Sequence, residues 1–477
     1  MTLRPFRLSL VLLLVAACVE DTSSKPTVDG GTSDASSGGK EDGFTPGSDG
    51  SVEGDAGIAL LTDAVAIAAG AEHTCALRAS QDVICWGGNG SGQLGVPAAQ
   101  TPRSSVPVRV TLPDGGKAKA IAAGTRHTCA LMTTGKIACW GENTTAQLGR
   151  SPLDPVNPNA DYVVDPIEFT SGWKGASAIA GGGGHTQALV PAGALVNGKD
   201  AFWLWGWGKN AFGQLTRDSF GFPVSSPLVA TLDGKEPTPS MNQLPVLAIA
   251  LGDDFGCAQG FIPTPGGSWF ERVVCFGASG KKQTGTLLPG STNLGAVWLS
   301  ETVALALPRG VAAGAQHACA IGGKVGGGES LYCWGDFSMG QTGQATPPAN
   351  AGYGAPVPDV DGTAITVFAA GGNNTCVVEN SKTRCIGAND EGQLASGKVD
   401  ADPHPSWSNV TLPSASALAV GRKHVCAILG AAAGSPGRVS CWGLNRTGQL
   451  GDGIDLDKGY ADGTFSRPAP VAVRAVK

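Results

Sequence analysis

The stretch HTCALMTTGKIACWGENTTAQLG, from His127 to Gly149, places two cysteines ten residues apart and a Trp-Gly pair directly after the second cysteine. A closely similar stretch, HTCALRASQDVICWGGNGSGQLG, begins at His73. With the short apolar run before each stretch included, seven copies begin at Ala68, Ala122, Ala180, Ala250, Ala312, Ala369 and Ala419. Because each repeat is one structural unit that packs on its neighbours, the copies predict a single array in place of several independent domains.

Each copy has the pattern of four short antiparallel strands. An apolar run such as AIAAG predicts the first strand, and HTCAL and IACWG predict the two arms of a hairpin. In the second copy the hairpin tip contains Gly135, a residue suited to the positive φ of a tight turn. A fourth strand follows a variable loop, as at Pro107–Val110 and Pro227–Ala230. Four short strands with two apolar faces are what a β-propeller blade needs, since each blade packs between two others.

The copies share the pattern A-A-G-x-x-H-(T)-x-A-L followed by W-G-x-N-x-x-G-Q-L-G. Over Ala68 to Gly451 this pattern resembles the repeat of the regulator-of-chromosome-condensation family. The resemblance implies an all-β fold, a closed seven-bladed propeller of four-stranded antiparallel blades. It does not carry over the tryptophan photochemistry of a plant photoreceptor in that family. The residues directly before the repeat histidines are not tryptophans but Glu72, Arg126, Gly184, Gln316 and Lys423.

Twelve of the thirteen cysteines fall in pairs at the same two repeat positions. The pairs are Cys75 with Cys85, Cys129 with Cys139, Cys257 with Cys275, Cys319 with Cys333, Cys376 with Cys385, and Cys426 with Cys441. Opposed residues on antiparallel strands have Cα atoms about 4.5–5.5 Å apart, which is within disulfide range. We align Gln187 and Leu204 with these positions in the third copy, so both cysteines are absent together, as expected of a bonded pair.

We therefore predict six structural disulfides, each within one hairpin. The rival interpretations are zinc ligation and redox catalysis. A zinc site needs four ligands whereas each hairpin offers two, and no C-x-x-C motif is present.

Histidine recurs at one repeat position and tryptophan at another. The histidines are His73, His127, His185, His317 and His424, and the tryptophans are Trp86, Trp140, Trp205, Trp334 and Trp442. Blades stack about 10 Å apart, so equivalent histidines are too distant to share a metal, whose bonds are near 2 Å. We expect the histidines to bond blade backbone and the tryptophans to pack between blades. We predict no catalytic residue, no metal site and no cofactor.

The N-terminus, MTLRPFRLSLVLLLVAACVED, has two arginines, an apolar run from Leu8 to Ala17, and then Cys18. The run is too short to cross a bilayer of about 30 Å and is typical of a signal peptide. The motif VAAC resembles a bacterial lipobox, which implies cleavage before Cys18 and acylation of this residue. Because Val19 follows, we expect an outer-membrane lipoprotein of the cell envelope. The alternative is an ordinary secretory signal with a chance cysteine.

These features divide the chain into a lipoprotein signal peptide at 1–17, a flexible tether at 18–57 and a propeller domain at 58–477. The tether is rich in Gly, Ser and Asp and has too few apolar residues to offset the entropy of ordering.

The net charge is −6 and no cluster of Lys or Arg is present, which argues against nucleic acid as a partner. We therefore interpret the chain as a non-enzymatic scaffold that binds an unidentified protein partner and meets the membrane only through its lipid anchor. One alternative is an inhibitor of a secreted or periplasmic enzyme, since a secreted β-lactamase inhibitor has this fold. Another is an enzyme with a site at the channel mouth. The sequence gives no indication of oligomeric state.

The hairpin tips lengthen in the third to fifth copies, and equivalent tips of a propeller emerge on one face. Phe202, Phe261, Trp269 and Phe270 would place aromatic area there, which is typical of binding hot spots. The alternative is that these aromatics cover the blade ends.

A last strand, Pro470–Val473, follows the seventh copy and no eighth copy follows it. We expect this strand to pair with the first blade near Ala64–Ala69 and so to close the ring.

Overall fold

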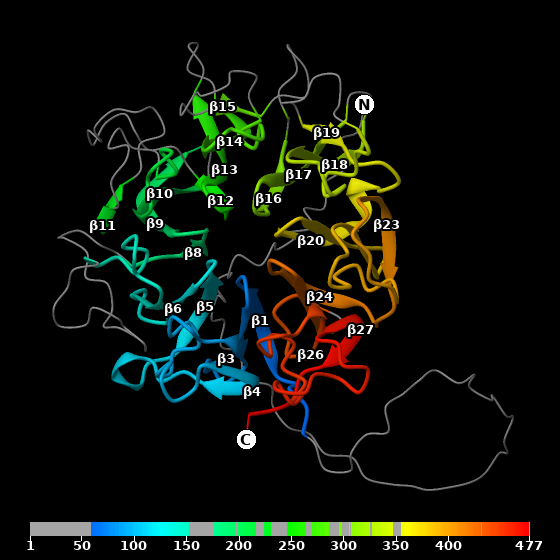
Figure 1. Ribbon diagram of the computed structural model, residues 1–477. Coiled ribbons are helices and arrows are strands. Elements are labelled where there is room, and N and C mark those ends of the chain that lie inside the picture. Colours follow the sequence, from blue (N-terminus) through cyan, green and yellow to red (C-terminus); the bar gives the residue numbers. More distant parts are fainter. Residues whose placement is uncertain are drawn as a thin grey trace, which may run out of the picture.

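The computed structural model describes residues 59–151, 175–196, 199–215, 224–229, 246–263, 269–285, 295–297, 305, 307–324, 327–346, 354–430 and 432–476. Its strands form seven antiparallel sheets that stand as blades around a central axis (Figure 1). Six sheets have four strands in chain order, and the second sheet has three within the described residues. The all-β, seven-bladed propeller predicted from the repeats is confirmed.

The strands of each blade follow one another directly along the chain. Blade one contains β1 (Ala64–Ala69), β2 (His73–Arg78), β3 (Val83–Gly88) and β4 (Arg103–Arg109). Blade two contains β5 (Ala118–Ala123), β6 (His127–Met132) and β7 (Ile137–Gly141). Blade three contains β8 (Ala178–Gly181), β9 (His185–Val196), β10 (Lys199–Gly208) and β11 (Val224–Val229). Blade four contains β12 (Val246–Leu251), β13 (Phe255–Pro263), β14 (Trp269–Gly277) and β15 (Gly295–Ala296). Blade five contains β16 (Arg309–Ala313), β17 (His317–Gly323), β18 (Glu329–Gly335) and β19 (Ala355–Pro356). Blade six contains β20 (Ile365–Gly371), β21 (Asn374–Glu379), β22 (Lys382–Gly387) and β23 (His404–Val410). Blade seven contains β24 (Ala415–Val420), β25 (His424–Leu429), β26 (Arg438–Leu444) and β27 (Ser466–Ala472).

Helix is limited, within the described residues, to two single turns of 3-10 helix at Pro113–Gly115 and Gly362–Ala364. In the same residues no helix has both the length and the apolar character to cross a membrane.

The innermost strands are built from small residues because they converge on the axis. β1 reads AVAIAA and β5 reads AKAIAA. The hairpin strands next to them are almost wholly buried, as in β6, because both of their faces pack on neighbouring blades. The alternation of side chains across a strand therefore gives two apolar faces in place of one.

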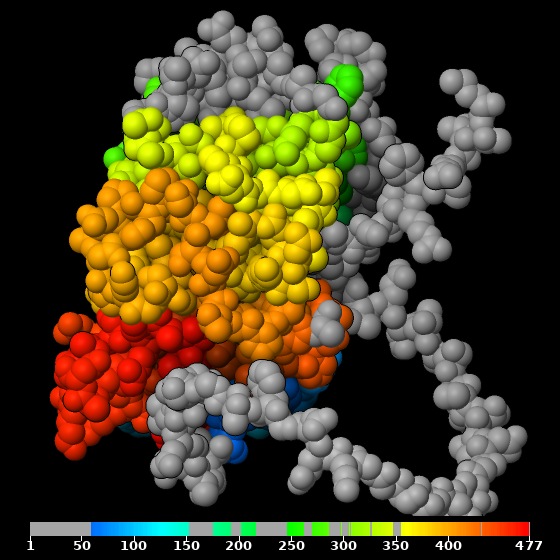
Figure 2. Space-filling model, turned by 90° about the vertical axis from the view of Figure 1, so that its right-hand side faces the viewer, coloured from blue at the N-terminus to red at the C-terminus, as the bar shows by residue number. Residues whose placement is uncertain are grey.

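The core lies between blades. Trp86 and Ile84 of blade one, for example, share a buried cluster with Ile428 and Leu450 of blade seven. In the side view of Figure 2 the blades from yellow to red are stacked one on the next, and the blue first blade lies beside the red seventh.

The ring does not close in the way the sequence predicts. β27 pairs with β26 and is the fourth strand of its own blade, so its expected pairing with the strand at Ala64–Ala69 was wrong. The segment before β1 and the first residue of β1 reach across: Leu61 N–H donates to the Val473 carbonyl at 3.0 Å, and Val439 N–H donates to the Leu61 carbonyl at 3.2 Å. Ala64 and Gly437 exchange two further backbone bonds, of 3.2 and 2.9 Å. The first and last blades each have four strands of their own, so backbone contacts at Leu61 and Ala64 and the shared core join the ends.

Candidate functional site

Seven tight turns, each joining the first and second strands of a blade, surround one end of the central channel. Each turn contains a glycine, at Gly70, Gly124, Gly182, Gly252, Gly314, Gly371 and Gly421. A Cβ on Gly70 would lie 2.2 Å from Cε1 of His73 and 2.6 Å from the Gly124 carbonyl oxygen, so this turn has no room for a side chain. Together the turns enclose a cavity of about 160 Å³, which we call the channel mouth.

Backbone hydrogen bonds join the turns of neighbouring blades. Ala71 N–H donates to the Thr125 carbonyl at 3.0 Å, and Asp253 N–H donates to the Ala315 carbonyl at 3.1 Å. Arg422 N–H reaches the Gly70 carbonyl at 3.3 Å, across the junction of the last and first blades. The mouth is therefore a bonded rim, and it fixes the backbone from which side chains project into the cavity.

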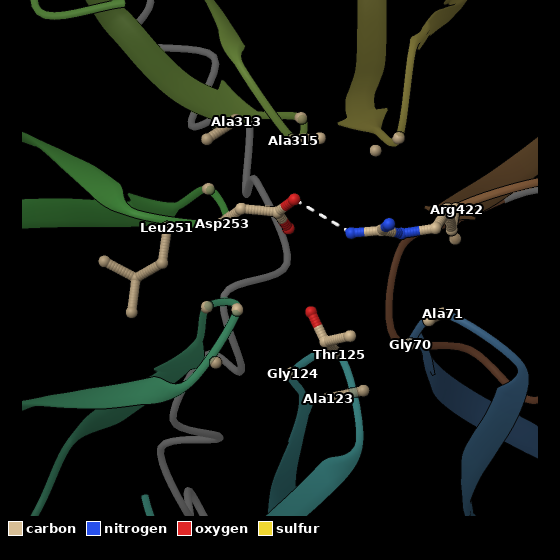
Figure 3. Close-up of a pocket in the computed structure, with 18 of the residues that line it drawn as sticks. Gly70, Ala71, Ala123, Gly124, Thr125, Leu251, Asp253, Ala313, Ala315 and Arg422 are labelled. Atoms are coloured by element: carbon tan, nitrogen blue, oxygen red, sulfur yellow. Dashed lines mark hydrogen bonds and ion pairs between the residues drawn. The ribbon is translucent and has the colours of Figure 1, made fainter. Parts of the chain in front are cut away.

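One ion pair crosses the channel mouth. Asp253 of blade four and Arg422 of blade seven point toward each other, with Thr125 of blade two below the gap (Figure 3). Nη2 of Arg422 donates to Oδ2 of Asp253 at 2.9 Å. Burial raises the pKa of the Asp253 carboxyl above its usual range, and the neighbouring Arg422 offsets this rise only in part.

The sequence reasoning missed this pair, although a signal was available. Asp253 and Arg422 occupy the same repeat position, directly after the turn glycine. Equivalent positions of a closed ring face a common axis, so opposite charges at one repeat position predict a contact across the channel.

The repeat histidines bind the next blade through side-chain hydroxyls. Nε2 of His73 lies 2.9 Å from Oγ1 of Thr128, and three other histidines make the same contact. These contacts are His127–Thr186, His317–Thr375 and His424–Thr74, at 2.8–2.9 Å. The Nε2 atoms thus bind threonine hydroxyls and not the expected backbone, because a Thr at the next repeat position of blades one, two, three and six presents its hydroxyl to the preceding blade.

Three junctions between blades lack this bond because the repeat departs from His and Thr. His185 lies at the junction with Gly256, Phe255 at the junction with Ala318, and Asn374 at the junction with Val425. In the last two junctions both members are replaced together. At the first, His185 keeps its ring but has no hydrogen-bond partner on either nitrogen among the described residues.

The backbone carbonyls of three repeat glutamines, Gln93, Gln147 and Gln449, each accept two side-chain bonds, one from a Thr and one from a Trp. The Gln93 carbonyl receives Oγ1 of Thr128 at 3.0 Å and Nε1 of Trp140 at 3.0 Å. Nε1 of Trp86 and Trp442 likewise bind the carbonyls of Gln449 and Gln393, both at 2.9 Å. The tryptophans thus pack between blades, as predicted, and also bind them.

Blade three shows how this arrangement tolerates change. Gln187 pairs with Gly206 and Thr186 pairs with Trp207, so Gly206 and Trp207 hold the positions that we assigned from the sequence to Leu204 and Trp205. The error was two residues, because the segment reads Trp-Gly-Trp-Gly and offers two alignments. Trp207 donates to the Gln147 carbonyl at 3.0 Å, as a repeat tryptophan does.

Gln187 stands at a cysteine position and also forms a hydrogen bond that blade four does not supply. Blade four has Gly256 and Phe276 where blades one to three have Thr and Trp, so it offers the Gln214 carbonyl no side-chain donor at these positions. Gln187 supplies one from its own blade: its Nε2 donates to the Gln214 carbonyl at 3.1 Å. The blade without a disulfide thus satisfies a carbonyl that its neighbour cannot.

The repeat cysteines form six disulfides, in the pairs that the sequence predicts. Each joins directly opposed residues of one hairpin, with Cα atoms 4.1 Å apart in every case, slightly closer than the 4.5–5.5 Å expected of opposed residues. The bonds join Cys75 with Cys85, Cys129 with Cys139, Cys257 with Cys275, Cys319 with Cys333, Cys376 with Cys385, and Cys426 with Cys441. Partners are 9 to 18 residues apart within a blade, so the bonds staple blades internally without linking one blade to another.

The repeat pattern and its geometry agree with known sequences. A profile of the regulator of chromosome condensation (RCC1) repeat matches residues 64–93 and 118–147, and a second profile of the same repeat matches residues 81–131. Residues 64–147 carry RCC1 repeats. The matched segments cover blades one and two, and the shared contacts above extend the repeat around the ring.

Several curated relatives share parts of this chain. The ultraviolet-B receptor UVR8 of Arabidopsis thaliana is 36% identical over 150 residues, 31% of this chain and 30% of that protein. The mitochondrial RCC1 domain-containing protein RUG3 of the same plant is 30% identical over 293 residues, 59% and 57% of the two chains. The probable E3 ubiquitin-protein ligase HERC4 of Homo sapiens is 30% identical over 229 residues, 48% of this chain and 18% of that protein. The chain thus spans less than two thirds of each of these relatives.

Solved RCC1-type structures share the fold. Yeast RCC1 (Prp20), solved in complex with Kap60, has a TM-score of 0.63 at 17% identity, and the match covers 93% of this chain and 91% of that one. Human WBSCR16 has a TM-score of 0.61 at 18% identity, covering 78% and 89%. At this identity the likeness is one of fold.

The predicted recognition aromatics do not form one exposed rim. Phe270 is exposed, at 49%, and lies under the Arg272 guanidinium at 5.2 Å. Phe202 is half-buried, and Phe261, which lies opposite Glu271 in the extended hairpin of blade four, is buried. The side chain of Trp269 lies outside the described residues. The sequence alone could not separate the two faces of a hairpin whose length was itself uncertain.

Other predicted features have no structural description. Cys18, the signal peptide and the tether fall in residues 1–58, outside the described part of the chain. Within the described residues, no group of three or more His, Cys, Asp or Glu side chains is placed to hold a metal ion.

Proposed function

We propose that this chain is a cell-envelope lipoprotein whose RCC1-repeat propeller is a non-enzymatic scaffold for a protein partner. The observation that carries the proposal is how the repeated side chains are used. The repeat Thr, Trp and Cys, and all the repeat histidines except His185, bond within or between blades. What distinguishes one blade from another is then its loops and hairpin tips, which is where propellers present binding surfaces.

The titles of two RCC1-type structures support a binding role by analogy. One describes yeast RCC1 bound to Kap60, and the other describes the binding of Prp20p to Gsp1p and histones. These partners belong to those proteins. HERC4 is named a probable ligase, but this chain matches 18% of it, and we propose no ligase step here.

The envelope part of the proposal rests on the N-terminal sequence. Cys18 follows a charged and then apolar segment, and the Gly/Ser/Asp-rich segment 18–57 precedes the propeller as a tether. The described chain begins at Ala59 beside Ala475, whose N–H donates to the Ala59 carbonyl at 2.7 Å. Ala64, the start of β1, pairs with Arg78 at the end of β2, so the chain enters on the face that carries the hairpin tips.

The hairpin-tip face is our choice for the partner surface. The hairpins of blades three and four have strands of 9 to 12 residues, whereas those of blade one have six. Phe270 is exposed on this extension and stacks with a cation, an arrangement that favours a protein contact.

The test is cross-linking capture from an envelope fraction with the full chain and two matched variants. Phe270→Ala removes an exposed aromatic from the tip face. Phe212→Ala removes one of similar exposure, 44%, from the loop beside the channel mouth. We expect loss of the captured protein with Phe270→Ala and retention with Phe212→Ala. The reverse result would place the partner on the other face, and capture unaffected by both would contradict the proposed surface.

Cys18→Ala tests the anchor separately. We expect the variant to leave the membrane and detergent fractions, and its persistence there would disprove lipidation at this residue.

A further inference from the structure

The channel mouth holds polar atoms that the fold does not use. The Asp253–Arg422 contact is a single hydrogen bond, from Nη2 to Oδ2 at 2.9 Å. Among the described residues, Oδ1 of Asp253, the Nε and Nη1 groups of Arg422 and the hydroxyl of Thr125 form no hydrogen bond. An acceptor with negative charge, donors with positive charge and a hydroxyl therefore converge from blades four, seven and two (Figure 3).

The surroundings leave this constellation accessible. The rest of the rim is glycine and alanine, with Leu251 and Val420 as its larger side chains. Arg422 and Asp253 are 51% and 34% exposed, so a solute can reach both without moving a blade. The cavity of about 160 Å³ is below the roughly 300–1,000 Å³ of pockets for drug-sized ligands, so its occupant must be small.

Charge decides what kind of small molecule fits. A simple anion near Arg422 would be repelled by Asp253, and a simple cation near Asp253 would be repelled by Arg422. A molecule that carries both charges on neighbouring atoms avoids both penalties. The carboxyl of Asp253 is also incompletely compensated by Arg422, since burial still raises its pKa, and a second cation would stabilise its ionised form.

We propose that the channel mouth binds a small zwitterion of the α-amino-acid class. Its ammonium group donates to Asp253, and its carboxylate accepts from the unused N–H groups of Arg422 and from the Thr125 hydroxyl. The bonded rim of turns holds these three residues at fixed positions, so binding requires little reorganisation. This site is independent of the protein-binding surface on the opposite face.

Calorimetric titration of the full chain with glycine and with L-alanine tests the proposal, with acetate and methylammonium as single-charge probes. We expect each zwitterion to bind at least about tenfold more tightly than either probe. Asp253→Asn and Arg422→Gln should each weaken glycine binding by about tenfold or more, and Thr125→Val by a smaller factor. Lys458→Gln is the control, because it removes a lysine that is paired with Asp455 at 3.0 Å on an exposed loop.

Two results would overturn the proposal: no saturable binding of glycine or alanine, or equal binding of acetate. Unchanged glycine affinity in Asp253→Asn would also overturn it, provided circular dichroism shows that the variant is folded. If that variant does not fold, Thr125→Val decides, because Thr125 offers its side chain to the cavity and its backbone bonds remain.

Discussion

Nζ of Lys209 lies 2.7 Å from Oδ1 of Asp254 across the junction of blades three and four, where the repeat His–Thr bond is missing. The other two junctions without that bond are bridged in the same way. Lys281 pairs with Asp336 across blades four and five at 3.4 Å, and Lys423 pairs with Asp390 across blades six and seven at 2.5 Å. Lysine–aspartate pairs at the surface thus cross every junction that lacks the buried histidine–threonine bond.

The Lys209–Asp254 pair predicts a salt-sensitive junction between blades three and four. Asp254→Asn should lower the free energy of unfolding by up to about 1 kcal/mol at low ionic strength, because the pair is partly exposed. The loss should shrink in about 1 M salt, where the screening length is about 3 Å. Denaturant unfolding at two salt concentrations measures both.

Glu142→Gln is the matched control for Asp254→Asn. Glu142 pairs with Arg126 inside blade two at 3.7 Å, and the junction of blades two and three has its His–Thr bond. We expect a smaller and less salt-dependent change from this variant. Identical responses of the two variants would show that the junction has no special dependence on the ion pair.

A second prediction concerns the buried hydroxyl of Thr128, which serves two blades. It contacts Nε2 of His73 and donates to the Gln93 carbonyl. Thr128→Val keeps the shape and leaves both of these groups without that partner, so we expect a loss of roughly 1–3 kcal/mol in unfolding free energy. Thr128→Ser restores the hydroxyl and should recover most of it. A Ser variant as unstable as Val would mean that the methyl group, and not the hydrogen bond, is what matters.

The sequence predicts those features of the structure that depend on residues repeated from blade to blade. The blades, the disulfide partners and the inter-blade tryptophans follow from residues that recur at the same repeat position, because one repeat position occupies the equivalent place in every blade. The His–Thr bond was missed because it links two different repeat positions on neighbouring blades. A sequence pattern does not show which neighbouring blade a hydroxyl contacts. The Asp253–Arg422 pair was missed because each residue looks like a variable turn position when its blade is considered alone.

A third prediction tests the register of blade three. Since Gln187 and Gly206 are directly opposed, the double variant Gln187→Cys with Gly206→Cys should form a seventh disulfide. A Cβ on Gly206 would lie 3.0 Å from Cδ2 of Leu215 and 3.4 Å from Cγ of Gln187, so only Leu215 must shift once Gln187 is replaced. The bond should stabilise by up to about 3 kcal/mol, less the cost of leaving the Gln214 carbonyl without its donor.

The alternative register gives the control for this disulfide. Leu204 pairs with Leu189 and not with Gln187, so Gln187→Cys with Leu204→Cys should leave free thiols. Thiol titration and peptide mapping without reduction distinguish the two double variants. A disulfide in the Leu204 variant and none in the Gly206 variant would restore the alignment drawn from the sequence.

The last prediction concerns acid, because the five repeat histidines are buried. Burial lowers the pKa of His73, His127 and His185 to about 3, and of His317 and His424 to about 4. An unfolded histidine has a pKa near 6.5, so below that pH the unfolded chain binds protons that the folded chain does not. Stability is therefore complete above about pH 6.5 and falls as pH drops toward 4, by up to about 1.4 kcal/mol per pH unit for each histidine.

His185→Phe isolates one of these contributions. Phe255 holds the same column in blade four and is fully buried, so the fold accepts Phe there. Because neither ring nitrogen of His185 has a hydrogen-bond partner among the described residues, the variant should be as stable as the parent at pH 7.5 or more so. It should also lose stability less steeply on acidification. His73→Phe forfeits the bond to Thr128 and should be destabilised at pH 7.5. Urea unfolding from pH 7.5 to 4.5 measures both variants, and a His185→Phe slope equal to that of the parent would show that this histidine does not resist protonation in the folded state.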